Sequence, residues 1–184
     1  MNYENLLVYR LATTIYDATE QFCKGYMVGY NFRRTVEQMT QAARSGKQNI
    51  VEGVLEKSSE SCLKLVGVAR ASFGELLEDY KDYLRVNHLS IWNKIDSRVL
   101  RIRAFKENVS NPTNLTNLSN WTNLCLDKPE DFANILICLI YKETYLLDKF
   151  YESLEKRFVE QGGFRENLFK KRIEYKIKTK EKIQ

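Results

Sequence analysis

Apolar residues recur every three or four positions along most of the chain, and this spacing predicts four long helices. The helices are expected at about residues 4–27, 35–53, 59–88 and 129–161. The first carries an apolar stripe at Leu7, Leu11, Ile15, Ala18 and Phe22, and the third at Cys62, Val66, Ala69, Phe73, Leu76, Tyr80 and Tyr83. The fourth carries its stripe at Leu136, Ile140, Thr144, Leu147, Tyr151, Leu154 and Phe158. Because the first three helices are joined by short connections, the pattern predicts an all-α, up-down four-helix bundle.

The second helix is unusual because its two stripes consist largely of small or polar side chains. The seam is Val36, Met39, Ala43, Gly46, Ile50 and Gly53, and beside it run Gln38, Ala42, Ser45, Asn49 and Glu52. Asn49 and Glu52 are either a catalytic pair or part of a hydrogen-bond network that sets helix register. We favour the network, because no His, Cys or second acid stands beside them. Gly53 is expected to end the helix as a left-handed cap.

An insertion separates the third and fourth long helices, at residues 91–128. Its first part predicts a short helix over 91–109, with Ile95, Val99 and Ile102 on one face and Lys94, Arg98 and Arg101 on another. That basic face is either solvated or docks on an acidic partner. Residues 111–124 are rich in Asn and predict a loop. Residues 1–163 are thus expected to form the bundle together with this insertion.

The formal charge lies in the last twenty residues. Residues 165–184 contain eight Lys or Arg and three Glu, a net charge of +5, whereas the rest of the chain has 21 basic and 21 acidic residues. Apolar positions persist among these charges, so residues 164–184 are predicted to be a basic extension. It is expected to form either a further short helix or an arm that orders on contact.

Composition and cysteine spacing exclude several classes of protein. The longest apolar run, Ile135–Tyr141, is far shorter than the roughly 20 residues that span a bilayer, and the first residues do not resemble a signal peptide. The four cysteines form no Cys-x-x-Cys pair and the chain has one histidine, so we expect no metal, no cofactor and a reduced, cytoplasmic protein. Glu52, Glu75 and Asp79 are the candidate acids for a di-metal core. Because no Glu-x-x-His motif accompanies them, we predict that the protein is not an enzyme.

Two consecutive segments carry a resemblance to a known family. They are QAARSGKQNIVEG, over Gln41–Gly53, and VARASFGELLEDYKDYL, over Val68–Leu84. Together they resemble the four-helix-bundle proteins encoded in intervening sequences of the large-subunit ribosomal RNA gene, a family that includes accessory proteins of diversity-generating retroelements. The matching positions are Asn49, Ile50, Glu52, Gly53, Ala69, Ser72, Glu75 and Leu76. The resemblance covers residues 10–85, and the basic tail resembles members with a C-terminal suffix segment. Gly46 departs from the family pattern, which carries a larger residue there, and is expected to loosen the contact between the two helices.

The resemblance implies a non-catalytic module that assembles as a ring-shaped pentamer with basic surfaces and either binds nucleic acid or supports a reverse transcriptase. Aromatic residues in excess of what a thin bundle buries are compatible with such an interface: Tyr16, Tyr26, Tyr30, Phe32, Tyr141 and Tyr145. The alternative is a monomer with partly exposed tyrosines.

The leading functional hypothesis is nucleic-acid binding through backbone and shape contacts, because no base-reading motif is present. The candidate residues are Arg33, Arg34, Arg44, Lys47, Arg98, Arg101, Lys170, Lys171, Arg172, Lys176 and Lys178. Phe169 and Tyr175 lie among the basic residues of the tail and are candidates for stacking on unpaired bases. The alternative interpretation of the tail is a solvated segment that only aids solubility. The alternative hypothesis for the protein is a protein-interaction scaffold or accessory subunit of a larger enzyme.

Overall fold

The computed structural model describes residues 2–105 and 126–181. Its helices are α1 (Leu7–Tyr26), α2 (Arg33–Leu55), α3 (Ser59–Val86), α4 (Ser97–Ala104), α6 (Pro129–Gln161) and α7 (Phe164–Glu181). Short 3-10 turns at Tyr3–Asn5 and Tyr30–Phe32 precede α1 and α2. Within these ranges the chain forms no strand, which confirms the all-α prediction.

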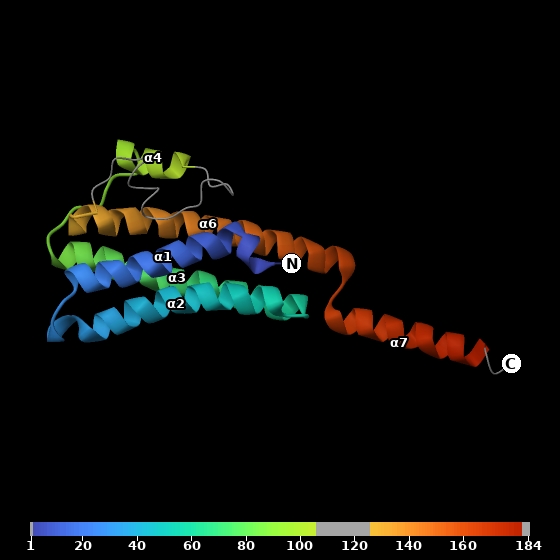
Figure 1. Ribbon diagram of the computed structural model, residues 1–184. Coiled ribbons are helices and arrows are strands. Elements are labelled where there is room, and N and C mark those ends of the chain that lie inside the picture. Colours follow the sequence, from blue (N-terminus) through green and yellow to red (C-terminus); the bar gives the residue numbers. More distant parts are fainter. Residues whose placement is uncertain (1, 106–125, 182–184) are drawn as a thin grey trace.

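The four long helices α1, α2, α3 and α6 lie side by side and alternate in direction, forming the expected up-down bundle (Figure 1). The short helix α4 lies on the outer side of α6. The last helix, α7, starts at the end of the bundle where α2 ends and points away from it. The tail is therefore a projecting helix, one of the two forms expected from its sequence.

Helix boundaries follow from local chemistry. Ser58 is the N-cap of α3, and its hydroxyl oxygen accepts a hydrogen bond from the backbone N–H of Ser61 at 3.4 Å. Pro129 occupies the first turn of α6, where its missing N–H costs no helical bond. Gly162 ends α6 with a φ of +74°, a conformation that favours glycine.

Gly53 does not cap α2, which contradicts the sequence prediction. The helix continues to Leu55, and Gly53 is a buried helical residue. A Cβ atom at Gly53 would lie 3.3 Å from Leu65 Cβ and 3.4 Å from the carbonyl oxygen of Cys62. Gly53 therefore permits close approach of α2 and α3 at the turn that joins them.

The predicted apolar stripes fill the core, except at Leu7 and Tyr151, which are 37% and 39% exposed. Phe22, Phe73 and Tyr80 are fully buried, and the Phe22 ring packs edge-on against Tyr80 and Phe132. The Tyr80 hydroxyl donates a hydrogen bond to Thr19 Oγ1 at 3.0 Å, and burial raises the pKa of this tyrosine. The buried Tyr80 hydroxyl is thus hydrogen-bonded, as burial of a polar group requires.

Gly46 lies on the side of α2 that packs against α3. A Cβ atom there would lie 2.7 Å from two carbon atoms of the Phe73 ring. The space that a larger residue would occupy is filled by this aromatic ring, which is itself fully buried. Gly46 therefore tightens the contact between the two helices, contrary to our expectation that it loosens it.

The insertion helix is shorter than predicted. Asp96 is its N-cap and accepts a hydrogen bond from the N–H of Arg98 at 2.8 Å, so the helix begins at Ser97 and not at residue 91. Val99 and Ile102 are buried as expected, whereas Ile95 precedes the helix and is 80% exposed. The predicted Asn-rich loop lies outside the described residues. None of the described helices is long and apolar enough to cross a membrane.

Candidate nucleic-acid interface

The helix α7 presents its side chains to solvent on all sides. Described side chains from Phe164 to Thr179 are exposed, except that Asn167 is half-buried. Lys171, Tyr175 and Lys178 are spaced by four and three residues and so lie along one side of the helix. Tyr175 is 72% exposed. The helix therefore presents an aromatic ring between two cations.

The root of α7 is fixed to the bundle. The backbone N–H of Gly163 donates to Glu166 Oε2 at 3.1 Å, and Asn167 Nδ2 donates to the carbonyl oxygen of Gln161 at 3.2 Å. Gly163 is buried, and a side chain there would collide with Glu60 and Phe158. These contacts seat the first turn of α7 against the start of α3 and the end of α6.

The surroundings of Glu60 at this junction stabilise the ionised form of its carboxyl. Its pKa is lowered, mainly by the hydrogen bond that it accepts from the Ser58 hydroxyl at 2.7 Å, and in part by the positive charge of Arg165. Arg165 thus interacts electrostatically with the bundle, whereas the cations farther along α7 extend beyond it.

Several cations of the bundle form ion pairs, whereas the described cations of α7 do not. Arg33, Lys81, Arg85 and Lys149 each pair with an acid three or four residues away on the same helix. Among described residues, no basic side chain of α7 forms an ion pair; these side chains are Arg165, Lys170, Lys171, Arg172, Lys176 and Lys178. The charges of these side chains, apart from Arg165 beside Glu60, are therefore available to an external anion.

The candidate cations of α2 do not form one patch with α7. Lys47 lies with Nζ 4.5 Å from the Tyr16 ring centroid, against α1, whereas Arg34 lines a groove on the α3 side. Arg33 pairs with Glu37 at 3.2 Å, and Arg44 is exposed. Arg33 and Arg34 stand at the start of α2, the end of the bundle opposite α7 (Figure 1).

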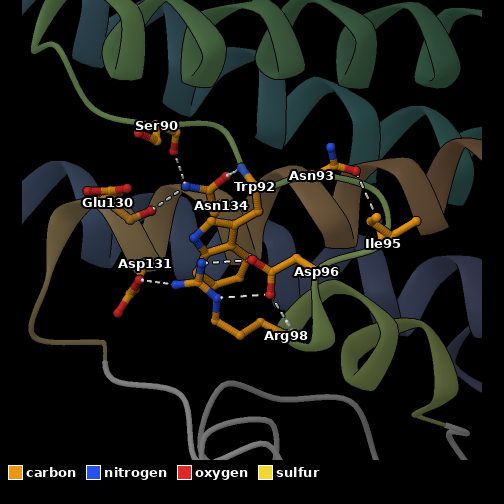
Figure 2. Close-up of polar contacts among 9 residues, drawn as sticks. All are labelled: Ser90, Trp92, Asn93, Ile95, Asp96, Arg98, Glu130, Asp131 and Asn134. Carbon is orange, nitrogen blue, oxygen red and sulfur yellow. Dashed lines mark hydrogen bonds and ion pairs between the residues drawn. The ribbon is translucent and has the colours of Figure 1, made fainter.

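Arg98 of α4 is held inside the protein's own polar cluster (Figure 2). Its guanidinium carbon lies 4.0 Å from the Trp92 ring centroid, and it pairs with Asp96 at 2.9 Å and Asp131 at 3.3 Å. Hydrogen bonds from Arg98 hold the pKa of the Asp96 carboxyl down to about 2. Arg101 is exposed. Arg98 and Arg101 are the candidate nucleic-acid-binding residues of α4. The charge of Arg98 is therefore neutralised locally by two carboxylates.

Asn134 anchors the segment that leads into α4, and sequence reasoning missed it. Its side-chain oxygen accepts from the N–H of Trp92 at 2.8 Å, and its amide nitrogen donates to the carbonyl oxygens of Ser90 at 2.8 Å and Glu130 at 2.9 Å (Figure 2). The residue is 1% exposed. Its position beside the longest apolar run of the chain was the only available signal of burial.

A groove of about 710 Å³ lies between α2 and α3, and two of the positions that carry the family resemblance, Ser72 and Glu75, line it. The hydroxyls of Ser45 and Ser72 lie 3.0 Å apart, and Asn49 Nδ2 donates to the Ser45 carbonyl oxygen at 2.8 Å. This network joins the two helices as predicted; Ser72 is buried, whereas Ser45 and Asn49 are half-buried. Glu52 is exposed and takes no part in it.

Glu75 and Asp79 line the same groove one turn apart on α3. Partial burial raises the pKa of the Asp79 carboxyl, and the nearby carboxylates of Asp82 and Glu75 raise it further. In the described part of the chain, neither Glu75 nor Asp79 forms an ion pair, and no group of three His, Cys, Asp or Glu residues is placed to hold a metal ion. Of the three candidate acids for a di-metal core, Glu75 and Asp79 thus line the open groove, and Glu52 is exposed outside its lining.

Three of the aromatic residues considered for an interface are exposed. Tyr30 is 90%, Tyr145 61% and Tyr141 46% exposed, whereas Tyr16, Tyr26 and Phe32 are half-buried. Comparison of the chain with models of protein families, with curated proteins and with solved structures finds no match. The family named from the motifs therefore stays a prediction.

Proposed function

We propose that this chain is a non-catalytic helical-bundle protein that binds single-stranded nucleic acid along α7. The observation that carries the proposal is the exposed row Lys171, Tyr175 and Lys178 on a helix that projects from the bundle. Cations spaced along a helix neutralise successive phosphates, and an exposed aromatic ring between them stacks on an unpaired base. The family resemblance adds self-association to this proposal. Each α7 is proposed to contact nucleic acid through its own side chains.

Backbone binding without sequence readout fits the chemistry of this surface. Lys forms point-charge contacts with phosphates, and a tyrosine ring stacks on every base. The side chains that α7 exposes between its cations are mainly apolar and do not offer the paired donors and acceptors that read base edges. We therefore expect affinity to depend strongly on salt and weakly on sequence.

The test measures binding of the full-length chain to a fluorescently labelled single-stranded RNA of mixed sequence over a series of salt concentrations. K171Q/K178Q is compared with K24Q/K64Q, which removes two exposed cations from the bundle. Loss of two phosphate contacts is expected to lower the slope of log affinity against log salt by about 1.4 in the first variant only.

A third variant separates stacking from charge. Y175A is expected to weaken binding by about 1–3 kcal/mol without changing the salt slope, because it removes a ring and no charge. The proposal is wrong if the intact chain does not bind the RNA, or if K171Q/K178Q binds like K24Q/K64Q.

A further inference from the structure

We propose that α7 of one copy of this chain docks along α3 of a second copy. The observation that leads to the proposal is a second side of α7, distinct from the row that carries Tyr175. Phe169, Ile173 and Ile177 recur every four residues there and are 64%, 40% and 52% exposed. Monomeric proteins seldom leave such a contiguous apolar stripe uncovered.

The receiving surface lies on α3. Gly67, Ala71 and Gly74 occupy one side of this helix. Apart from the adjoining residues and the backbone of the same helical turn, no atom of the described residues lies within 4 Å of where a Cβ would stand at either glycine. Glycine destabilises a helix interior, and nothing within the described chain approaches closely enough to require it at these two positions. A helix from another molecule can approach this side of α3 closely.

The flanks of the two surfaces carry complementary charges. Arg172 and Lys176 border the apolar stripe of α7 and lie four residues apart. Glu75 and Asp79 border the small residues of α3 with the same spacing, and in the described structure they have no ion-pair partner, although Arg34 also lines their groove. Docking places two cations beside two carboxylates and relieves the repulsion between the acids.

The occupant is a second copy because α7 points away from its own α3 (Figure 1). Tyr141 and Tyr145 of α6 border the other flank of α3, where Lys81 Nζ lies 5.7 Å from the Tyr141 ring centroid. These exposed rings extend the apolar surface available to the incoming helix. Lys171, Tyr175 and Lys178 face away from the docked stripe, so docking and nucleic-acid binding use different sides of α7.

The first experiment measures the association of the full-length, nuclease-treated chain by sedimentation equilibrium over a range of concentrations. G67L/G74L fills the receiving surface and is expected to abolish association, whereas G25L, at another glycine with open space on α1, is expected to associate like the natural chain. Circular dichroism and urea unfolding establish that each variant is folded. A monomeric natural chain, or unchanged association of folded G67L/G74L, overturns the proposal.

A charge exchange keeps the proposal testable if leucine disturbs folding. R172E/K176E and E75K/D79K are each expected to weaken association about tenfold or more, and the fourfold variant that combines them is expected to recover most of it. K171Q/K178Q is expected to associate normally, so this result is separable from the nucleic-acid proposal. Failure of the combined variant to recover association overturns the pairing.

Discussion

At the scale of single residues, two glycines with the same helical conformation have opposite consequences. The Phe73 ring fills the space beside Gly46, whereas the space beside Gly74 is open. G46A is therefore expected to destabilise the fold by about 1–3 kcal/mol through overpacking. G74A is expected to stabilise the monomer by about 0.5–1 kcal/mol, because alanine is the better helix former. Urea unfolding measured at low protein concentration checks both values, and a stabilising G46A would show that Phe73 moves aside at little cost.

Removal of the buried Asn134 side-chain amide is expected to destabilise the fold. N134A leaves the Trp92 N–H and the Ser90 carbonyl without their side-chain partner, so a loss of about 1–3 kcal/mol in unfolding free energy is expected. N87A is the matched control. Asn87 also donates to a backbone carbonyl, that of Tyr83 at 2.8 Å, but it is exposed, so its loss is expected to cost less than about 0.5 kcal/mol. Equal losses in the two variants would contradict the anchoring role of Asn134.

At the scale of helices, the ion pairs of Arg98 with Asp96 and Asp131 join α4 to α6, and their contribution to stability is expected to depend on pH. The folded-state pKa of Asp96 is about 2, below the value of about 3.9 in an unfolded chain, so its contribution to stability is complete above pH 4 and is lost as pH falls toward 2. D96N keeps a capping side chain without the charge. The difference in unfolding free energy between the natural chain and D96N is expected to shrink from pH 4 to pH 2. A difference that is constant over this range would exclude ionisation of Asp96 as its cause.

The long helices were predictable because each buries one continuous side, which fixes the spacing of its apolar residues. The errors came from contacts between residues distant in sequence. From the sequence, Gly53 has the character of a helix cap, and only the close approach of Leu65 shows why glycine is needed there. Asn134 looks like an ordinary helical residue, and only its hydrogen bond to Trp92, 42 residues away, shows its role. In α7 the apolar residues lie on two opposite sides, a pattern that did not decide between a helix and an extended arm.

At the scale of the whole molecule, charge and burial are separated in space. The bundle holds nearly all of the buried side chains and a balanced set of charges, whereas α7 carries the net charge and, apart from its first turn, lies clear of the bundle. The candidate cations of α2 and α4 stand on other parts of the molecule, and several already have acidic partners. This distribution makes α7 the surface from which both proposed interactions follow.

The same separation predicts unequal stability along the chain. An isolated helix of 18 residues is marginal in water, and α7 has few packing contacts to support it. In dilute solution its amide hydrogens are expected to exchange within about 100-fold of the unstructured rate, whereas those of the buried segment 132–147 of α6 are expected to exchange only on global unfolding. Hydrogen exchange followed by mass spectrometry measures both segments in one sample. Raising the protein concentration is expected to slow exchange in α7 of the natural chain but not of G67L/G74L, because only the natural chain provides the receiving surface. Exchange in α7 as slow as in α6 at every dilution would show that α7 is stable on its own and needs no partner.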